Sequence, residues 1–320
     1  MSETYPATDE LAQGLAAVLA ANGDLSIERR EPNRYASTFA SEIVTCRVGS
    51  GRVELLCKYG PAGEDNTRAN RHRGGVPYEA SVYERCLSRA GCSTPAYHGR
   101  FDLPRAGRCC LVVQYLAGAQ PAGKMAHRWP LSQVATWIGR FHAMHTGQLD
   151  ERRYAFLCRY DASYYRFWAE RAAMQGSDYG DARWLAELGT GFADRAIELL
   201  GGDETLIHGE FYPSNVLVQD ETVYPVDWES AAIGAGVIDL AALTENWPVE
   251  EVRACRDAYV AARFAGQAPG DFDRRLDAGR LYLHLRWLGG RVDWTRRARA
   301  RRSRLDAVRR ISDRLGIMRD

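Results

Sequence analysis

Hydrophobic and polar positions follow two different periods along the chain. Up to about residue 117, short apolar runs rich in Val, Ile, Thr and Tyr are bounded by turns that contain Gly and Ser, which is typical of β-strands. The strands predicted in this way cover residues 34–48, 53–60 and 109–116. Two further segments, 9–22 and 77–90, have apolar positions at helical spacing. The pattern predicts a β-rich N-terminal part with a few helices.

From Leu131 onward the apolar positions recur every three to four residues, which predicts helices. A single hydrophobic core stops growing at roughly 250–300 residues, so a chain of 320 residues is expected to form two domains. Segment 117–130 is small, polar and rich in Pro and Gly, as linkers are. We predict an N-terminal domain over 1–117 and a helical domain over 118–320. The predicted helical segments of the second domain are 131–147, 160–174, 181–202, 240–248, 249–265 and 272–290.

The composition argues against several classes of partner. The 42 basic and 41 acidic residues give a net charge of +1, so no overall field favours nucleic acid or a membrane surface. No apolar run approaches the roughly 20 residues of a membrane span, and the acidic N-terminus is unlike a signal peptide. Eight cysteines without CxxC spacing indicate reduced thiols that pack as small hydrophobic groups. We therefore expect a cytoplasmic protein with small-molecule partners, and the sequence leaves its oligomeric state open.

The segment between Leu206 and Val218 concentrates the polar chemistry of the chain. It places Glu210 two residues after His208, and Asn215 five residues after Glu210, between two apolar runs. This is the spacing of a phosphoryl-transfer catalytic loop. An attacking hydroxyl needs an acceptor for its proton, which Glu210 offers. A Mg²⁺ ion that bridges phosphates needs oxygen ligands, and Asn215 offers one.

A second apolar run follows this loop and ends in Asp227. Because Mg²⁺ prefers carboxylate oxygens, Asp227 is expected to supply the anionic metal ligand. Asn215 and Asp227 would then lie at the ends of adjacent strands and bind one ion.

Lysine is rare in this chain. It occurs only at Lys58 and Lys124, and every other basic residue is Arg. A compact ammonium on a flexible stem acts on phosphates as a point charge, which the planar guanidinium of Arg does not copy. Lys58 lies in the predicted strand 53–60 and is therefore a candidate phosphate-binding residue, whereas Lys124 in the linker is expected to be solvated.

Three motifs, HGExxxxN, VDWE and VIDLA, resemble those of the aminoglycoside phosphotransferase and choline kinase-like superfamily, whose usual pattern is HGDxxxxN, IDWE and D-L-A. The resemblance implies an α+β, bilobal protein kinase-like fold with a small β-rich lobe and a larger helical lobe. Glu210 would occupy the position of the catalytic Asp, and Asn215 and Asp227 those of the metal ligands. Asp239 would be the structural Asp that braces the catalytic loop. Glu210 departs from the pattern because Glu is longer by one methylene.

The resemblance also implies a role for an acidic residue in the helix at 77–90. Glu79 resembles the helix Glu that holds the strand Lys, here Lys58, against the α and β phosphates of a nucleotide. Glu84, further along the same segment, is the competing candidate. The structural alternative for Glu79 is a solvated acid in the first turn, where the helix dipole favours negative charge.

Two more parts of a nucleotide site follow from the resemblance alone. Gln114, Tyr115 and Leu116 would form the hinge whose backbone binds an adenine or guanine edge, with a buried strand end as the alternative. Ser37 and Thr38 lie in the loop that would cover the phosphates. This loop lacks a Gly-rich signature, so an ordinary hairpin turn is an equally good interpretation.

Two segments of the helical domain have a functional and a structural interpretation. Tyr164, Phe167, Trp168 and Arg171 share one helix face, which favours core packing over an acceptor-binding platform. The Arg-dense tail at 296–304 lacks the interleaved aromatic residues of a nucleic-acid site. Apolar residues at helical spacing after it predict a final amphipathic helix with an Arg-rich outer face.

The function predicted from these residues is transfer of the γ-phosphate of ATP or GTP, with Mg²⁺, to a hydroxyl of a small molecule. By resemblance, an antibiotic or another natural product is a reasonable acceptor class. One alternative is a pseudokinase that binds a nucleotide without catalysis, because Glu210 replaces Asp. The other is nucleotidyl transfer by the same metal cluster.

Overall fold

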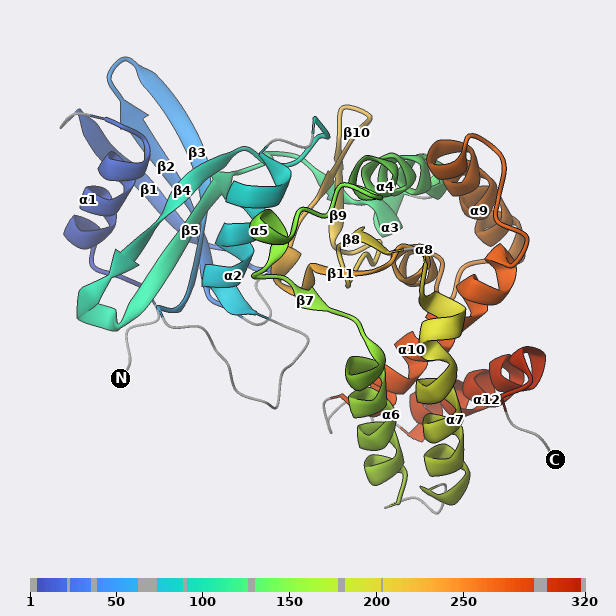
Figure 1. Cartoon of the computed structure of the whole chain (residues 1–320). Coiled ribbons are helices and arrows are strands. Elements are labelled where there is room, and N and C mark those ends of the chain that lie inside the picture. Colours follow the sequence, from blue (N-terminus) through green and yellow to red (C-terminus); the bar gives the residue numbers. More distant parts are fainter. Residues whose placement is uncertain are drawn as a thin grey trace. The chain divides into compact units, whose positions relative to one another are not determined.

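The computed structural model describes residues 5–21, 24–35, 39–62, 74–88, 91–125, 130–177, 182–202, 204–290 and 298–317 (Figure 1). Its contacts group the chain into two compact units. The first comprises Met1–Lys124 with Asn215–Ser230, and the second comprises Met125–Ser214 with Ala231–Asp320. The mixed α+β class predicted from the sequence is confirmed. The division falls at Lys124 rather than at residue 117, and the first unit also takes up residues 215–230.

An antiparallel sheet forms the centre of the first unit, with the strand order β1-β2-β3-β5-β4. Strands β2, β3 and β5 match the predicted apolar runs, whereas β1 and β4 were not predicted. Both missed strands lie at the sheet edges, where half-exposed positions carry Arg, Glu and Asp and dilute the apolar alternation. The strand bounds are β1 Leu25–Pro32, β2 Ser41–Val48, β3 Gly51–Pro61, β4 Tyr97–Leu103 and β5 Arg108–Gln114.

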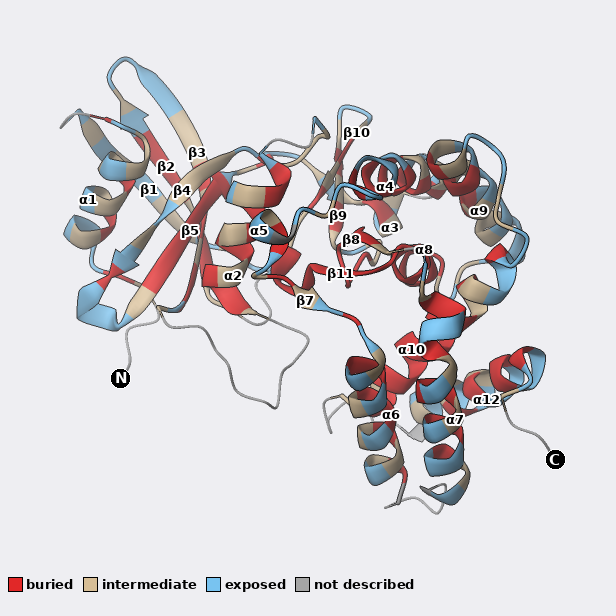
Figure 2. Ribbon diagram, viewed as in Figure 1, coloured by how far each residue is buried: buried red, intermediate tan, exposed pale blue. Residues whose placement is uncertain are grey.

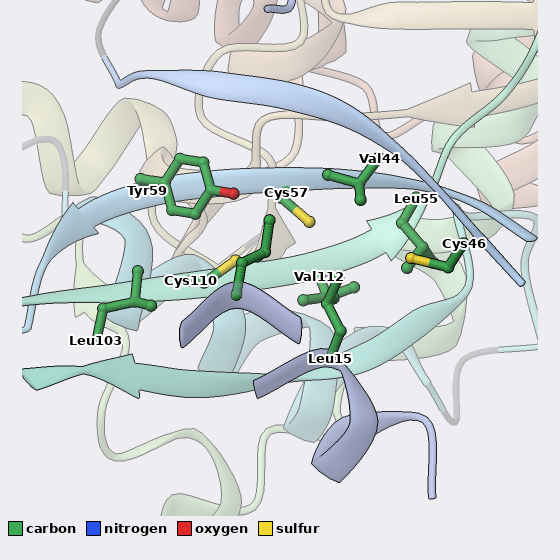
Figure 3. Packing of buried hydrophobic residues seen from close by; sticks show 10 residues of the cluster. Leu15, Val44, Cys46, Leu55, Cys57, Tyr59, Leu103, Cys110 and Val112 are labelled. Atoms are coloured by element: carbon green, nitrogen blue, oxygen red, sulfur yellow. The ribbon is translucent and has the colours of Figure 1, made fainter. Parts of the chain in front are cut away.

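One face of this sheet packs against helix α1 (Thr8–Val18) and forms a buried core (Figure 3). Leu11 and Leu15 of the helix are fully buried, in one cluster with sheet residues such as Val44, Leu55 and Val112. Three thiols belong to the same core: Cys46, Cys57 and Cys110. The sequence interpretation of cysteines as small hydrophobic groups is confirmed here, and all eight cysteines are free thiols.

Helix α2 (Gly75–Val82) continues into a π-helical turn, Tyr83–Leu87, and together they cover the predicted helical segment. The first unit also holds a smaller sheet of order β10-β9-β6. Its strands pair Gln120 with Val218 and Pro225 with Val216, which explains why the linker up to Lys124 and residues 215–230 belong to this unit. The bounds are β6 Gln120–Pro121, β9 Val216–Gln219 and β10 Thr222–Pro225, with a 3-10 turn at Trp228–Ser230 and a short helix α3 at Ala122–Met125.

The second unit is mainly helical, as predicted. A small sheet of order β7-β11-β8 lies within it, and β8, β11 and α8 are almost entirely buried (Figure 2). The outer faces of α6 and α7 are exposed, as amphipathic periodicity requires. The bounds are α4 Leu131–His145, α5 Glu151–Tyr154, β7 Cys158–Arg159, α6 Ala162–Ser177, α7 Ala182–Leu200, β8 Glu204–Ile207, β11 Ala232–Ala235, α8 Val237–Leu243, α9 Val249–Phe264, α10 Phe272–Leu288 and α12 Ala298–Leu315.

Two structural interpretations of the helical unit are confirmed. Tyr164 and Trp168 are buried, and the Tyr164 hydroxyl lies 2.9 Å from that of Tyr282, so this face of α6 is core. The described part of the tail, from residue 298, forms α12, which buries Leu305 and Val308 and leaves many of its arginines at the surface. Among the residues described, no helix combines the length and the apolar character needed to cross a membrane.

Candidate active site

The β9–β10 hairpin brings the two predicted metal ligands to one end. Val216 pairs with Pro225, and the Val226 N–H donates to the Asn215 carbonyl at 2.9 Å. Asn215 therefore precedes one strand, and Asp227 follows the other, at the open end of the same hairpin. Apolar residues at Val216, Val218 and Val223 are buried and hold this hairpin in place.

The backbone at Asp227 has a left-handed conformation, with φ at +67°. Non-glycine residues with such a φ are uncommon, although Asp and Asn tolerate it better than most. In the strand conformation the side chain would continue the alternation of β10. The left-handed turn changes its direction instead, and such local strain is frequent at ligand-binding positions.

In the first unit, Lys58 contacts both a residue predicted to help bind the nucleotide, Glu79, and a predicted metal ligand, Asp227. Its Nζ donates to Glu79 Oε2 at 2.7 Å and to Asp227 Oδ1 at 2.6 Å. The other oxygen of Glu79 accepts the backbone N–H of Trp228 at 3.1 Å. Glu79 thus holds both the lysine and the backbone next to Asp227. The structure selects Glu79 over Glu84, which is exposed.

The charges of this cluster stabilise one another in a buried setting. Burial alone would lower the pKa of Lys58, but Glu79, Asp227 and Glu229 raise it well above its ordinary value, so the ammonium stays charged. Burial raises the pKa of Glu79, an effect that Lys58 opposes. Lys58 Nζ also lies 5.7 Å from the centre of the Phe39 ring, a cation–π distance.

Replacing Glu79 with Gln is expected to weaken nucleotide binding about tenfold, because the amide no longer holds Lys58 by charge. The substitution leaves the buried ammonium of Lys58 with Asp227 as its hydrogen-bonded carboxylate, so circular dichroism is first used to establish that the variant is folded. Isothermal titration with ATP and Mg²⁺ checks the affinity. Glu84→Gln is the matched control on the same helical segment, and equal affinities for the two variants would contradict the role of Glu79.

The predicted catalytic loop lies in the second unit, directly after strand β8. Asp239, at the first turn of α8, accepts the backbone N–H of His208 at 2.7 Å and that of Gly209 at 2.9 Å. Asp239 is completely buried. Its burial raises its pKa to about 6, which the hydrogen bonds from the loop oppose. The geometry is that of the loop brace that the resemblance implies for Asp239.

Further side chains position the carboxylate of Asp239. His142 Nε2 lies 3.1 Å from Asp239 Oδ2, and His142 Nδ1 lies 2.9 Å from the Tyr259 hydroxyl, which accepts from Arg263 at 2.5 Å. Burial lowers the pKa of His142 well below its ordinary value, so the ring is neutral and positions Asp239. Only glycine fits at Gly236, because a Cβ there would lie 2.6 Å from His142 Nδ1.

Glu210 is buried and makes an ion pair. Arg286 in α10 donates from Nη1 to Glu210 Oε1 at 3.0 Å and from Nη2 to the Tyr212 hydroxyl. The Glu210 N–H lies 3.3 Å from His208 Nδ1, so the ring of His208 helps to hold the loop rather than to accept a substrate proton.

The remaining predicted site residues stay predictions. Ser37 and Thr38 lie outside the described residues. Gln114 ends β5, and its backbone N–H donates to the Ala96 carbonyl, while the N–H of Tyr115, just beyond the strand, donates to the Glu54 carbonyl in β3. Leu116 is buried just beyond.

Three residues of the site were missed from the sequence. Glu229, in the VDWE motif, is buried and contributes to the high pKa of Lys58, and its motif was the available signal. Tyr212 lies within the catalytic loop segment. Arg286 lies 76 positions beyond Glu210 in an ordinary helical pattern, and no local signal marks it.

An antiparallel sheet with a buried Lys–Glu pair, a hairpin that ends in Asn and Asp, and a braced HGE loop together define a phosphotransferase with a kinase-like fold. The family model of the phosphotransferase enzyme family matches residues 68–275. The chain therefore belongs to this family, as its motifs predicted. No curated protein sequence matches the chain.

Several solved structures share the fold. The choline kinase of Cryptosporidium parvum Iowa II is 14% identical, with a TM-score of 0.60 and 91% of each chain covered. A macrolide 2'-phosphotransferase from Brachybacterium faecium is 18% identical, with a TM-score of 0.58, over 92% of this chain and 98% of that one. An amicoumacin kinase, in complex with AMP-PNP, Ca²⁺ and Ami, is 12% identical, with a TM-score of 0.59 and 88% of each chain covered.

Proposed function

We propose that the protein transfers the γ-phosphoryl group of ATP or GTP to a hydroxyl of a small molecule. The bond between the γ-phosphorus and the β–γ bridging oxygen breaks, a bond to the acceptor oxygen forms, and the hydroxyl proton passes to Glu210. The products are a phosphorylated acceptor and a nucleoside diphosphate. The observation that carries this proposal is the contact of Lys58 with both Glu79 and Asp227 at the end of the β9–β10 hairpin.

The residues of the hairpin suit a divalent cation. Mg²⁺ is usually bound by one or two protein oxygens, with water and phosphate oxygens completing its shell. Asn215 and Asp227 offer an amide and a carboxylate oxygen. Within the described ranges, no group of three or more His, Cys, Asp or Glu side chains could hold a metal ion. When bound, Mg²⁺ neutralises charge on the phosphates.

Lys58 would contact phosphate oxygens, and Glu79 would keep its ammonium in place. Glu210 would orient the acceptor hydroxyl and take its proton. A loose transition state depends mainly on such positioning and on electrostatic stabilisation. For the acceptor, we propose a hydroxylated natural product such as an antibiotic. Two of the structures that share the fold are named for a macrolide and for amicoumacin.

The first test of this function is a thermal shift of the purified protein with ATP or GTP, with and without Mg²⁺. The better nucleotide is then incubated with a panel of hydroxylated metabolites and antibiotics, and the products are weighed by mass spectrometry. A gain of one phosphoryl group on an acceptor is the expected result. A gain of a nucleotidyl group would indicate the alternative chemistry, nucleotide binding without product would favour the pseudokinase, and no binding would contradict the site.

Replacing Glu210 with Gln is expected to lower kcat by about 10²- to 10⁴-fold, the usual contribution of a positioned general base. Binding of the nucleotide should remain, because the Lys58 cluster belongs to a separate set of contacts. The matched control is Glu204→Gln in β8, which removes a surface ion pair with Arg159. A Glu210→Gln enzyme as fast as the control would exclude Glu210 as the base.

A further inference from the structure

The carboxylate of Glu210 is held by a residue that the family motifs do not contain. Arg286 donates one hydrogen bond from Nη1 to the Glu210 carboxylate and another from Nη2 to the Tyr212 hydroxyl. Both charged side chains are buried, with 6% of Glu210 and 4% of Arg286 exposed. The Tyr212 N–H also donates to the Glu210 carbonyl at 2.7 Å. Arg286 therefore fixes both ends of a tight turn.

We propose that Arg286 is the positioning residue of Glu210, and that Glu at this position and Arg in α10 act as a matched pair. The inference rests on the proposed function, since it concerns the group that receives the acceptor hydroxyl. Arg286 itself is not expected to touch the reacting atoms.

Side-chain length supports the match. An aspartate is shorter than a glutamate by one methylene, or about 1.5 Å. The present distance from Arg286 Nη1 to Glu210 Oε1 is 3.0 Å, well within the range of a charge-assisted hydrogen bond. With Asp at position 210 and the same backbone, the carboxylate would lie beyond this range. The longer side chain is thus suited to a loop whose carboxylate is held from α10.

The pair also fixes the direction of the carboxylate. Burial alone would lower the pKa of Arg286, but Tyr212 and Glu210 raise it well above its ordinary value, so the guanidinium stays charged. A charged, planar partner favours the ionised form of a carboxylate and fixes its orientation. Because phosphoryl transfer depends on positioning, an oriented and ionised carboxylate is the state that the reaction requires.

Helix α12 supports this arrangement through aromatic contacts. The rings of Tyr212 and Trp287 stack with their centres 5.7 Å apart, and the guanidinium of Arg304 lies 3.5 Å from the centre of the Trp287 ring. Trp287 follows Arg286 directly in α10. The Arg-rich helix thus stabilises the side of α10 from which Arg286 reaches the loop.

The experiment compares Arg286→Met, Arg286→Lys and a matched control, Arg280→Met, on the acceptor found with the wild-type enzyme. Arg280 lies in the same helix and pairs with Asp277 instead. Circular dichroism establishes that each variant is folded. Arg286→Met is expected to lower kcat about 100-fold while the KM for the nucleotide stays within about threefold, because only the orientation of Glu210 is lost. Arg286→Lys should recover part of the rate, and Arg280→Met should resemble the wild type.

Glu210→Asp adds a double-mutant cycle. In the wild-type background we expect a loss of at least about tenfold in kcat, and in the Arg286→Met background almost no further loss, since the pair is already broken. If Arg286→Met does not fold, the cycle is run with Arg286→Lys. Unchanged kcat in the Arg286 variants, or losses that simply multiply, would overturn the matched pair. A wild type that yields neither a phosphorylated acceptor nor ADP would overturn the proposed function instead, and the inference with it.

Discussion

Replacing Asp227 with Asn should lower the rate of phosphoryl transfer by at least about a thousandfold. The change removes the anionic ligand expected for Mg²⁺ and one of the two carboxylates that contact Lys58. Asn tolerates the left-handed backbone at this position, so the hairpin should keep its shape. The measurement is kcat with ATP over a range of Mg²⁺ concentrations, together with the thermal shift on addition of nucleotide. We expect the Mg²⁺ dependence of that shift to disappear.

A matched control for this change lies in the same hairpin. Asp220, in the turn between β9 and β10, also has a positive φ and is exposed. Asp220→Asn should leave both the rate and the Mg²⁺ dependence as in the wild type. Similar rates for Asp227→Asn and Asp220→Asn would exclude Asp227 as a metal ligand.

Replacing Asp239 with Ala should lower the free energy of unfolding by about 3–5 kcal/mol, the cost of removing one partner from a buried charged network. The variant leaves the N–H groups of His208 and Gly209 and the ring of His142 without their acceptor in a buried setting. Urea denaturation measures the loss. The control Asp194→Ala removes an exposed carboxylate paired with Arg166 and should cost less than about 1 kcal/mol. An equal effect of the two substitutions would contradict the bracing role.

The same residue gives this network a pH dependence. Folding raises the pKa of Asp239 from 3.8 to about 6, so between these values the folded state holds a proton that the unfolded state has released. The stability contributed by protonated Asp239 is therefore fully present below about pH 3.8 and is lost as the pH rises through about 6. Relative to Asp239→Asn, which does not titrate, the wild type should lose up to about 3 kcal/mol across this window. A difference that stays constant with pH would contradict the raised pKa.

Local signals in the sequence were sufficient for most of the fold. Most helices of the second unit occur where apolar residues recur at helical spacing, and α4, α9 and α10 begin at the predicted residues. Because these helices bury a continuous apolar face, the helical periodicity of their apolar residues is clear in the sequence. The helix predicted at 240–248 is instead α8, Val237–Leu243, and the short helix α5 was not predicted. Strands β1 and β4 have a weaker alternation because edge strands expose much of their surface, and this explains why they were not predicted.

The residues of the candidate site also divide into those that the sequence could predict and those that it could not. The spacing of His208, Glu210 and Asn215 is encoded within eight residues, so the catalytic loop could be predicted from a short segment. The Lys58–Glu79 contact required the family resemblance, because the two residues are 21 positions apart. The contact of Glu210 with Arg286 depends on how α10 packs in the folded unit. No spacing rule reaches across 76 residues, and the arginine therefore looked like any other polar position of its helix.

The buried thiols of both compact units have a practical consequence for labelling. Burial raises the pKa of Cys46 to about 11 and that of Cys255 to about 12, and it raises those of Cys109 and Cys110 as well, so little reactive thiolate forms at neutral pH. Cys92 and Cys158 are partly exposed instead. One belongs to each compact unit. A maleimide dye is expected to react at these two positions first, and the natural sequence thus provides one attachment point for a spectroscopic label in each half of the protein.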